Sequence, residues 1–296
     1  MCNWVLIVVP SIFGQMGLCD WGSSSGLSLV FLHDYLMCVC FMILSVVGCV
    51  LVLVVPKVSY FCGGIHFRNV YRNNSLELWW TIIPIMMIVV MGYPSFVQLY
   101  AMGMNDKAKF ITVKVTGHQW YWSYEYVVHL PTLISLAEEL GIFKDFGSSG
   151  LGETEGEMNA EGVLSFSNTS DWMISYDSYT VSVDSGADGL GYRYGQHVDY
   201  PMVLPSDSNV EIKVTSADVI HCWTIQGLGV KMDAVPGRVN TAHLSDLRPG
   251  FTGWGGCSEM CGVNHWQMSA EVEVLSVSDF VLWILTWVYS DMKDLD

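Results

Sequence analysis

Two long runs of apolar residues dominate the first third of the chain. Residues 35–55 read YLMCVCFMILSVVGCVLVLVV and residues 78–97 read LWWTIIPIMMIVVMGYPSFV, and neither run contains a charged side chain. A helix rises about 1.5 Å per residue, so roughly 20 apolar residues cross the hydrocarbon core of a bilayer. The pattern therefore predicts a transmembrane helical hairpin over residues 27–104, with spans at about 35–55 and 78–100.

The loop between the two runs indicates how the hairpin is oriented. Residues 56–75 carry Lys57, Arg68 and Arg72 and no acidic side chain. Basic residues that flank a span mark the side on which a loop stays, so both termini and the acidic remainder are predicted on the opposite side. Two buried core helices are the alternative, and the basic loop disfavours them. Residues 1–26 are either a leader that is removed or a retained surface segment.

After Ala101 the pattern changes to short segments in which apolar and polar residues alternate. Alternation is seen in FITVKV (110–115) and NVEIKV (209–214), while HQWYWSYEYVV (118–128) is rich in aromatic and β-branched residues. Such segments are typical of half-buried strands. Because they are separated by Gly, Pro, Asp and Ser, they predict a β-sandwich or small barrel over residues 105–296.

An acidic stretch interrupts this pattern at about 127–175. It begins with LISLAEELGIF (133–143), which predicts a short helix, and continues with GSSGLGETEGEMNAEG (147–162). A segment rich in Gly, Ser and Glu cannot bury enough apolar surface to fold by itself. The stretch is therefore interpreted as an acidic insertion in the β domain.

Composition and charge narrow the class of protein. Hydrophobic residues make up 51% of the 296 residues and charged residues only 14%, which favours a membrane protein. The formal charge of −16 disfavours a nucleic-acid binder, because nucleic-acid binding needs basic surface. The same charge favours a partner protein with a basic face.

Candidate metal chemistry is concentrated in GWGGCSEMCGVNHWQM (253–268). Cys257, Cys261 and His265 follow one another at intervals of four residues, and Met268 comes three residues later. The glycines around the cysteines indicate a loop between strands. A disulfide leaves His265 and Met268 without a role, and a zinc site leaves Met268 idle. Copper binds thiolate, imidazole and thioether together, so copper is favoured, with zinc second and a disulfide third.

A second histidine comes from DVIHCWTI (218–225), another strand-like segment. On a strand His221 and Trp223 share one face and Cys222 points to the other. His221 is therefore the candidate second histidine of the metal site, and Cys222 is directed away from it.

Four segments of the chain resemble cytochrome c oxidase subunit II. They are LELWWTIIP (76–84), GHQWYWSYEY (117–126), DVIHCW (218–223) with GLGVKMDAVPGRVN (227–240), and CSEMCGVNHWQM (257–268). The resemblance implies a membrane-anchored α+β protein: an N-terminal two-helix transmembrane hairpin followed by a cupredoxin-like Greek-key β-barrel. It also implies that a dinuclear copper centre, copper A, accepts electrons from cytochrome c. These electrons pass to the haem of the catalytic subunit I, which reduces oxygen to water with proton pumping.

Carried over to this sequence, the resemblance implies a complete ligand set for two copper ions. The ligands are His221, Cys257, Glu259 through its backbone carbonyl, Cys261, His265 and Met268. Two bridging thiolates leave two terminal ligands for each metal: His265 with the Glu259 carbonyl, and His221 with Met268. The Glu259 carboxylate is expected to reach a magnesium ion shared with subunit I. A solvent-facing loop acid is the alternative for that side chain.

The resemblance assigns further roles outside the ligand set. Trp120 becomes the electron entry point, and on a strand it would share a face with Trp122. Glu125 and Asp218 become docking acids for cytochrome c, steering a basic partner. Glu77 becomes the entrance of a proton path. The alternatives are barrel core for the tryptophan, ordinary surface charge for the docking acids and an interfacial helix-start acid for Glu77.

Oxygen reduction itself is assigned to another subunit. None of the eight histidines lies within residues 35–55 or 78–97, so no haem ligand is found in the two apolar runs. The chain is thus expected to act as an oxidoreductase only as part of the oxidase, with subunit I, other oxidase subunits and membrane lipid as partners. The expected location is the mitochondrial inner membrane, with the copper domain and both termini in the intermembrane space.

Three alternatives stand beside this interpretation. A membrane-tethered binding domain stabilised by zinc or by a disulfide also explains the two spans and the acidic outer domain. A quinol-oxidising relative keeps the fold but lacks the ligands, and the full ligand set argues against it. The outer face of a bacterial plasma membrane is the alternative location.

Overall fold

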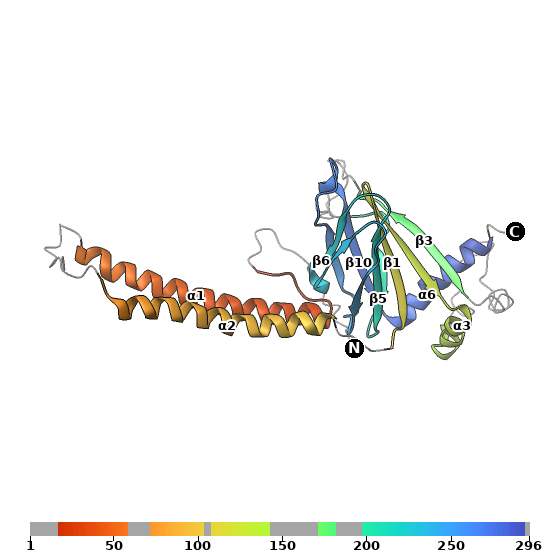
Figure 1. Cartoon of the computed structure of the whole chain (residues 1–296). Helices are drawn as coiled ribbons and strands as arrows, with labels where there is room; N and C mark the ends of the chain where they lie inside the picture. The colour runs from red at the N-terminus through yellow and green to blue at the C-terminus, as the bar shows by residue number, and fades with distance from the viewer. Residues whose placement is uncertain (1–16, 59–71, 104–107, 143–170, 182–196, 294–296) are drawn as a thin grey trace, which may run out of the picture. The chain divides into compact units, whose positions relative to one another are not determined.

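A computed structural model of the chain describes residues 17–58, 72–103, 108–142, 171–181 and 197–293 (Figure 1). It divides into two compact units. One unit is Ser28–Met104, and the other combines residues Met1–Leu27 with Asn105–Asp296. The N-terminal apolar stretch, most of the basic loop and the Gly- and Glu-rich part of the insertion lie outside the described residues.

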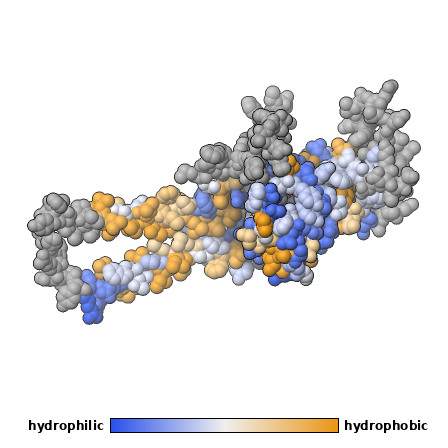
Figure 2. All heavy atoms as spheres, turned by 90° about the horizontal axis from the view of Figure 1, so that it is seen from above, coloured by the Kyte–Doolittle hydropathy of each residue, from blue (hydrophilic) through white to orange (hydrophobic). Residues whose placement is uncertain are grey.

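Two long helices form the first unit. Helix α1 spans Ser24–Val58 and helix α2 spans Asn74–Gly103. Their apolar side chains are exposed along most of the described length, as the orange surface in Figure 2 shows. The Tyr35 hydroxyl donates to the Val90 carbonyl at 3.2 Å and the Gln98 amide donates to Ser28 Oγ at 2.6 Å, so the helices lie side by side and antiparallel. Both helices are long and apolar enough to cross a membrane.

The helices extend beyond the apolar runs that predict them. Helix α1 begins 11 residues before Tyr35 and therefore contains His33, which the sequence pattern places ahead of the span. His33 is next to Asp34, with 3.1 Å between Nδ1 and Oδ1. Helix α2 accommodates Pro84 and Pro94 in its interior, as transmembrane helices do when backbone groups find other partners.

Ten strands form two five-stranded sheets in the described part of the second unit. In the first sheet the order is β3-β2-β1-β5-β8 and in the second it is β4-β10-β9-β6-β7. The first sheet contains β3 (Trp172–Ser178), β2 (Tyr121–Val128), β1 (Ile111–His118), β5 (Val210–Ser216) and β8 (Asn240–Leu244). The second contains β4 (Met202–Pro205), β10 (Ser269–Leu275), β9 (Thr252–Cys257), β6 (His221–Ile225) and β7 (Val230–Ala234).

The alternating pattern of the sequence accounts for this sandwich. In β1 the side chains of Val113 and Val115 are fully buried, and in β2 those of Trp122 and Tyr124 are. Because the side chains of a strand alternate between its two faces, each apolar set lies on the core side of its sheet. The predicted fold, a two-helix membrane hairpin followed by a β domain, is confirmed.

Two helices cover the sandwich at the end away from the metal loop. Helix α6 (Val277–Lys293) contacts β3, β4 and β10 and also α3 (Leu130–Glu139). Helix α3 is the short helix that the sequence predicts at the start of the insertion. Strands occupy both ends of the 127–175 stretch, since β2 runs to Val128 and β3 begins at Trp172.

The segment before α1 is attached to the β domain. The Gly22 N–H donates to the Gly227 carbonyl at 2.8 Å, and the Gly22 carbonyl accepts from the Arg248 N–H at 2.9 Å. The Arg248 guanidinium also lies 5.2 Å from the centre of the Trp21 ring, a cation–π distance. Residues 17–27 are therefore part of the folded β domain.

Candidate metal centre

Two strand ends and one loop bring the predicted ligands together. His221 is the first residue of β6 and Cys257 the last of β9, and these strands pair with Trp223 opposite Cys257. Cys261 and Met268 lie on the loop that joins β9 to β10, and His265 opens the 3₁₀ helix η3 (His265–Gln267) in that loop. The predicted loop is confirmed at Gly262, whereas Gly255 and Gly256 lie in β9.

The donor atoms of these residues converge on the two cysteines. Cys257 Sγ lies 3.8 Å from Cys261 Sγ, 3.8 Å from His221 Nδ1 and 3.1 Å from the Glu259 carbonyl oxygen. Cys261 Sγ lies 3.5 Å from His265 Nδ1 and 4.0 Å from Met268 Sδ. The ligand atoms of His221, Cys257 and Cys261 all lie within 4.8 Å of one another.

The geometry of the site distinguishes between the three alternatives that the sequence leaves open: a disulfide, a zinc site and a copper site. Both cysteines are free, and a disulfide requires about 2.05 Å between the sulfurs. Met268 is buried with its thioether directed at a cysteine sulfur, a donor that zinc sites do not need. Two thiols, two imidazole nitrogens and a thioether form a soft donor set, which fits copper.

The surroundings of the two thiols shift their pKa values in opposite directions. Burial opposes ionisation of Cys257, but hydrogen bonds with the His221 ring and with backbone groups outweigh it and lower the thiol pKa to about 6. Burial and the neighbouring charge of Cys257 raise the pKa of Cys261 to about 12. Although burial opposes it, contact with Cys257 and Asp218 raises the pKa of His221. The contacts of Cys257 with His221 and with backbone groups thus favour the thiolate form of Cys257.

A carboxylate outside the ligand set orients His221. Asp218 Oδ1 lies 2.8 Å from His221 Nε2, while His221 Nδ1 faces Cys257. Burial raises the Asp218 pKa, but hydrogen bonds with His221 and with backbone N–H groups lower it overall. Metal-ligating histidines commonly have such a partner on the second ring nitrogen. Sequence reasoning considered Asp218 only as a docking acid, since nothing in the spacing indicates this contact.

Gln119 connects the β1–β2 turn to both sides of the site. Its backbone N–H donates to Asp218 Oδ2 at 2.6 Å and its side-chain amide donates to the Cys261 carbonyl at 2.8 Å. Sequence reasoning missed this residue. Its partner Cys261 is 142 positions away, so no local pattern signals the contact.

The prediction that Trp120 and Trp122 share a strand face is wrong. Trp120 lies in the turn between β1 and β2, and only Trp122 is in β2, where it is fully buried. The Trp120 ring packs on Gly262, where a Cβ would lie 3.0 Å from Cζ2. Trp120 therefore lies beside the metal loop, adjacent to Cys261. Tyr121 stacks on His118 with 4.6 Å between ring centres.

The side chains of Glu125, Glu259 and Glu77 are the remaining predicted site groups. Glu125 forms an ion pair with Lys114, at 2.9 Å to each carboxylate oxygen. The Glu259 side chain is exposed. Glu77 lies in the first turn of α2, where its N–H donates to the Asn73 carbonyl at 3.0 Å. An acid in that turn is favoured by the helix dipole.

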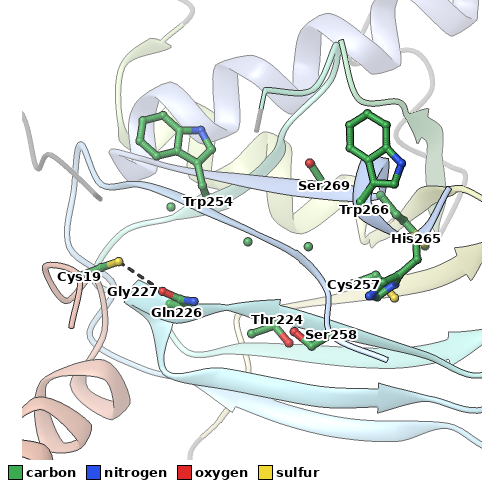
Figure 3. A pocket seen from close by; sticks show the side chains of 14 residues that line it. Cys19, Thr224, Gln226, Gly227, Trp254, Cys257, Ser258, His265, Trp266 and Ser269 are labelled. Carbon is green, nitrogen blue, oxygen red and sulfur yellow. Dashed lines mark hydrogen bonds between the residues drawn. The ribbon is translucent and has the colours of Figure 1, made fainter. Parts of the chain in front are cut away.

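A pocket of about 520 Å³ runs along β9 beside the site (Figure 3). Cys257 and His265 lie at one end of it, and Cys19 and Gln226 at the other, joined by a 3.4 Å contact between the thiol and the amide oxygen. Met268 also lines the pocket. The metal ligands are therefore reachable from this side of the domain.

Comparisons with known proteins agree with the geometry of the site. The family model described as cytochrome c oxidase subunit II, transmembrane domain, matches residues 11–98. The model described as cytochrome c oxidase subunit II, periplasmic domain, matches residues 159–275 and so includes the metal loop. The relative named cytochrome c oxidase subunit 2 from Drosophila subobscura is 32% identical over 274 residues, which cover 93% of this chain and 97% of the relative. The chain belongs to the cytochrome c oxidase subunit II family.

Another curated relative and one solved structure are also similar to this chain. Cytochrome c oxidase subunit 2 of Drosophila bifasciata is 32% identical over 95% of this chain and 100% of its own length. Among solved structures, the periplasmic domain of subunit II of cytochrome oxidase from Bradyrhizobium japonicum is 26% identical, with a TM-score of 0.42. It covers 62% of this chain and 97% of its own. This subunit II chain is thus a subunit of a cytochrome c oxidase, with two transmembrane helices and a domain whose His/Cys/Cys cluster fits a copper A site.

Proposed function

We propose that the chain accepts electrons from cytochrome c at a dinuclear copper A centre and delivers them to the haem of subunit I, where oxygen is reduced to water with proton pumping. The observation that carries this proposal is the convergence of soft donors on Cys257 and Cys261. Four donor groups lie around the two sulfurs: the rings of His221 and His265, the Glu259 carbonyl and the Met268 thioether. A binding domain with no redox role would not need them all.

The residues that hold copper have separable tasks in this proposal. Bound copper would supply a one-electron carrier, and the thiolates of Cys257 and Cys261 would hold it. His221 and His265 present Nδ1 to these sulfurs, and the Glu259 carbonyl faces Cys257. Met268 contributes a weak thioether, the kind of ligand that tunes a potential more than it holds a metal. Asp218 keeps the His221 ring in position through Nε2.

Electron entry is assigned to the Trp120 ring. The ring is half-buried and packs on Gly262, next to Cys261 in the chain. A basic cytochrome c is steered by the acidic surface, with Glu125 and Asp218 as docking acids. Both carboxylates already have partners in the structure, Lys114 for Glu125 and His221 for Asp218. Their long-range field is therefore partly compensated, and the rest of the net charge of −16 contributes to steering.

Two further roles concern the boundary with subunit I. The exposed Glu259 carboxylate is proposed to bind a magnesium ion shared with subunit I, since magnesium takes few protein carboxylates and keeps its waters. Glu77, at the start of α2, is proposed to stand at the entrance of a proton path. Both proposals extend family properties to matching positions of this sequence.

The proposed location is the mitochondrial inner membrane. The β domain and both termini would face the intermembrane space, where cytochrome c is found, and α1 and α2 would be surrounded by lipid and other oxidase subunits. The basic loop between the spans supports this orientation.

Turnover with cytochrome c tests the function. The oxidase assembled with this chain should oxidise reduced cytochrome c, and Cys261→Ser should abolish that activity together with the copper A absorption. Cys222→Ser is the matched control, because Cys222 is buried next to Thr224 and its thiol is directed away from the site. Full turnover in Cys261→Ser contradicts the proposal. An equal loss of cytochrome c oxidation in Cys261→Ser and Cys222→Ser also contradicts it.

A further inference from the structure

One hydroxyl binds the backbone on both sides of Met268. Thr180 Oγ1 donates to the Gln267 carbonyl and accepts from the Ser269 N–H at 3.0 Å. The backbone groups immediately before and after Met268 are therefore bound to the same oxygen atom. Thr180 is 87 residues away from Gln267 in the sequence, so this contact comes from the tertiary fold.

Thr180 is itself held in place by backbone pairing. It follows β3 and forms an isolated antiparallel bridge with Val198. On either side of it the Val181 N–H donates to the His197 carbonyl at 2.9 Å, and the Asp199 N–H donates to the Tyr179 carbonyl at 3.0 Å. Four peptide groups thus fix the position from which the hydroxyl reaches the metal loop.

The backbone at Met268 has weaker support from its own turn. Its N–H donates to the His265 carbonyl at 3.4 Å, a long hydrogen bond at the end of η3. Its carbonyl accepts from the Cys257 N–H at 2.9 Å. Without the Thr180 hydroxyl, the Gln267 carbonyl and the Ser269 N–H would each lose a partner, and the turn that presents the thioether would be free to relax.

We propose that Thr180 is a positioning residue that fixes the thioether of Met268 against Cys261 and thereby sets the redox potential of the metal centre. The inference rests on the proposed copper A function, with Met268 as the weak ligand. The buried Met268 Sδ lies 4.0 Å from Cys261 Sγ. A weak thioether ligand would tune the potential of bound copper, so the group that fixes the Met268 backbone would control how closely the thioether approaches the metal.

Thr180→Val in the assembled oxidase tests the inference. Valine keeps the shape of threonine and removes only the hydrogen bonds. The copper A potential should rise, because a retreating thioether donates less to the oxidised state, and copper affinity should fall roughly tenfold, as for other residues that orient ligands. Redox titration of the copper A absorption band and competition with a cuprous chelator measure these two effects without recourse to turnover.

Two variants make the test specific to the hydroxyl. Thr180→Ser retains the hydroxyl and should restore both values to those of the unsubstituted protein. Thr116→Val makes the same substitution at a buried threonine whose Oγ1 has no hydrogen-bond partner among the described residues, and it should leave both values unchanged. If Thr180→Val does not assemble, Thr180→Ala takes its place with the same expected direction.

The outcomes distinguish this inference from the function on which it rests. An unchanged potential and copper affinity in Thr180→Val overturn the inference, as does an equal shift in Thr180→Ser, which would reflect packing and not the hydroxyl. Absence of any copper A signal in the unsubstituted oxidase refutes the proposed function instead.

Discussion

Asp218 Oδ1 lies 2.8 Å from Nε2 of His221, on the side of the ring opposite the cysteines. The ring is fully buried, so this carboxylate fixes which nitrogen faces Cys257. The same side chain is also a docking candidate, and the two roles give different experimental signatures. Orientation of the ring affects copper binding without any cytochrome c present.

Asp218→Asn should lower copper affinity by about 10-fold or more, because outer partners that orient a ligating histidine contribute on that scale. The measurement is competition with a copper chelator in the absence of cytochrome c. Asp233→Asn is the control, since Asp233 is an exposed acid on β7. Equal affinities in Asp218→Asn and the unsubstituted protein would mean that the contact does not orient the ring.

Gly262→Ala should slow electron entry from cytochrome c while copper remains bound. A Cβ at Gly262 would lie 3.0 Å from Trp120 Cζ2 and 3.1 Å from Nε1, so the ring must shift. The residue also has φ of +131°, a conformation that alanine adopts only with strain of about 1–3 kcal/mol. Rapid-mixing kinetics of copper A reduction measure the entry rate.

Gly250→Ala is the control that distinguishes the two effects of Gly262→Ala, which are displacement of the Trp120 ring and backbone strain. Gly250 also has a positive φ, +73°, but nothing lies within 4 Å of its Cβ position. The Gly250→Ala variant should therefore be less stable than the unsubstituted protein but should accept electrons at the same rate. If both alanine variants slow entry equally, the Trp120 contact is not responsible.

Gln119→Leu should also slow electron entry, because it removes the 2.8 Å hydrogen bond from the side-chain amide to the Cys261 carbonyl. A displacement of about 1 Å at a reacting group can reduce a rate by roughly 100-fold. Stopped-flow reduction by cytochrome c measures the effect, and the copper A spectrum serves as the internal check that the metal remains. Gln267→Leu, on the metal loop, is the control; equal rates in the two variants speak against a role for Gln119.

The metal-free protein should show one unusually reactive cysteine. The pKa of Cys257 is lowered to about 6, so its alkylation by iodoacetamide should rise through a midpoint near pH 6 as the thiol loses its proton. Cys261 and Cys222, with pKa values raised to about 12 and about 11, should remain protonated and slow up to pH 8. Mass spectrometry of the labelled peptides distinguishes them. A midpoint near 8.5, the ordinary value for a free cysteine, would contradict the described contacts.

The membrane hairpin and the β domain were predictable because their signals are local. Uncharged runs predict the helices, and alternation predicts strands such as β1 and β5. The lengths of the helices were less predictable. Helix α1 begins at Ser24, whose N–H donates to the Ser245 carbonyl at 3.2 Å, so the first residues of the helix belong to the β unit.

The ligand loop was predictable from residue types and glycines, but the residues around it were not. Trp120 lies in a turn formed by Gln119 and Trp120, which carries none of the Gly, Pro, Asn or Asp residues that signal turns. The contacts of Gln119 with Cys261 and of Thr180 with Gln267 join residues 142 and 87 positions apart. Such contacts follow from the packing of the two sheets and leave no trace in spacing.

The electron paramagnetic resonance spectrum of the oxidised, assembled oxidase tests the central claim most directly. The account predicts hyperfine structure from one unpaired electron shared equally by two copper nuclei, which Cys257→Ser and Cys261→Ser should each eliminate. A subunit that contains stoichiometric zinc, or that gives no copper signal assignable to these two cysteines, would contradict it.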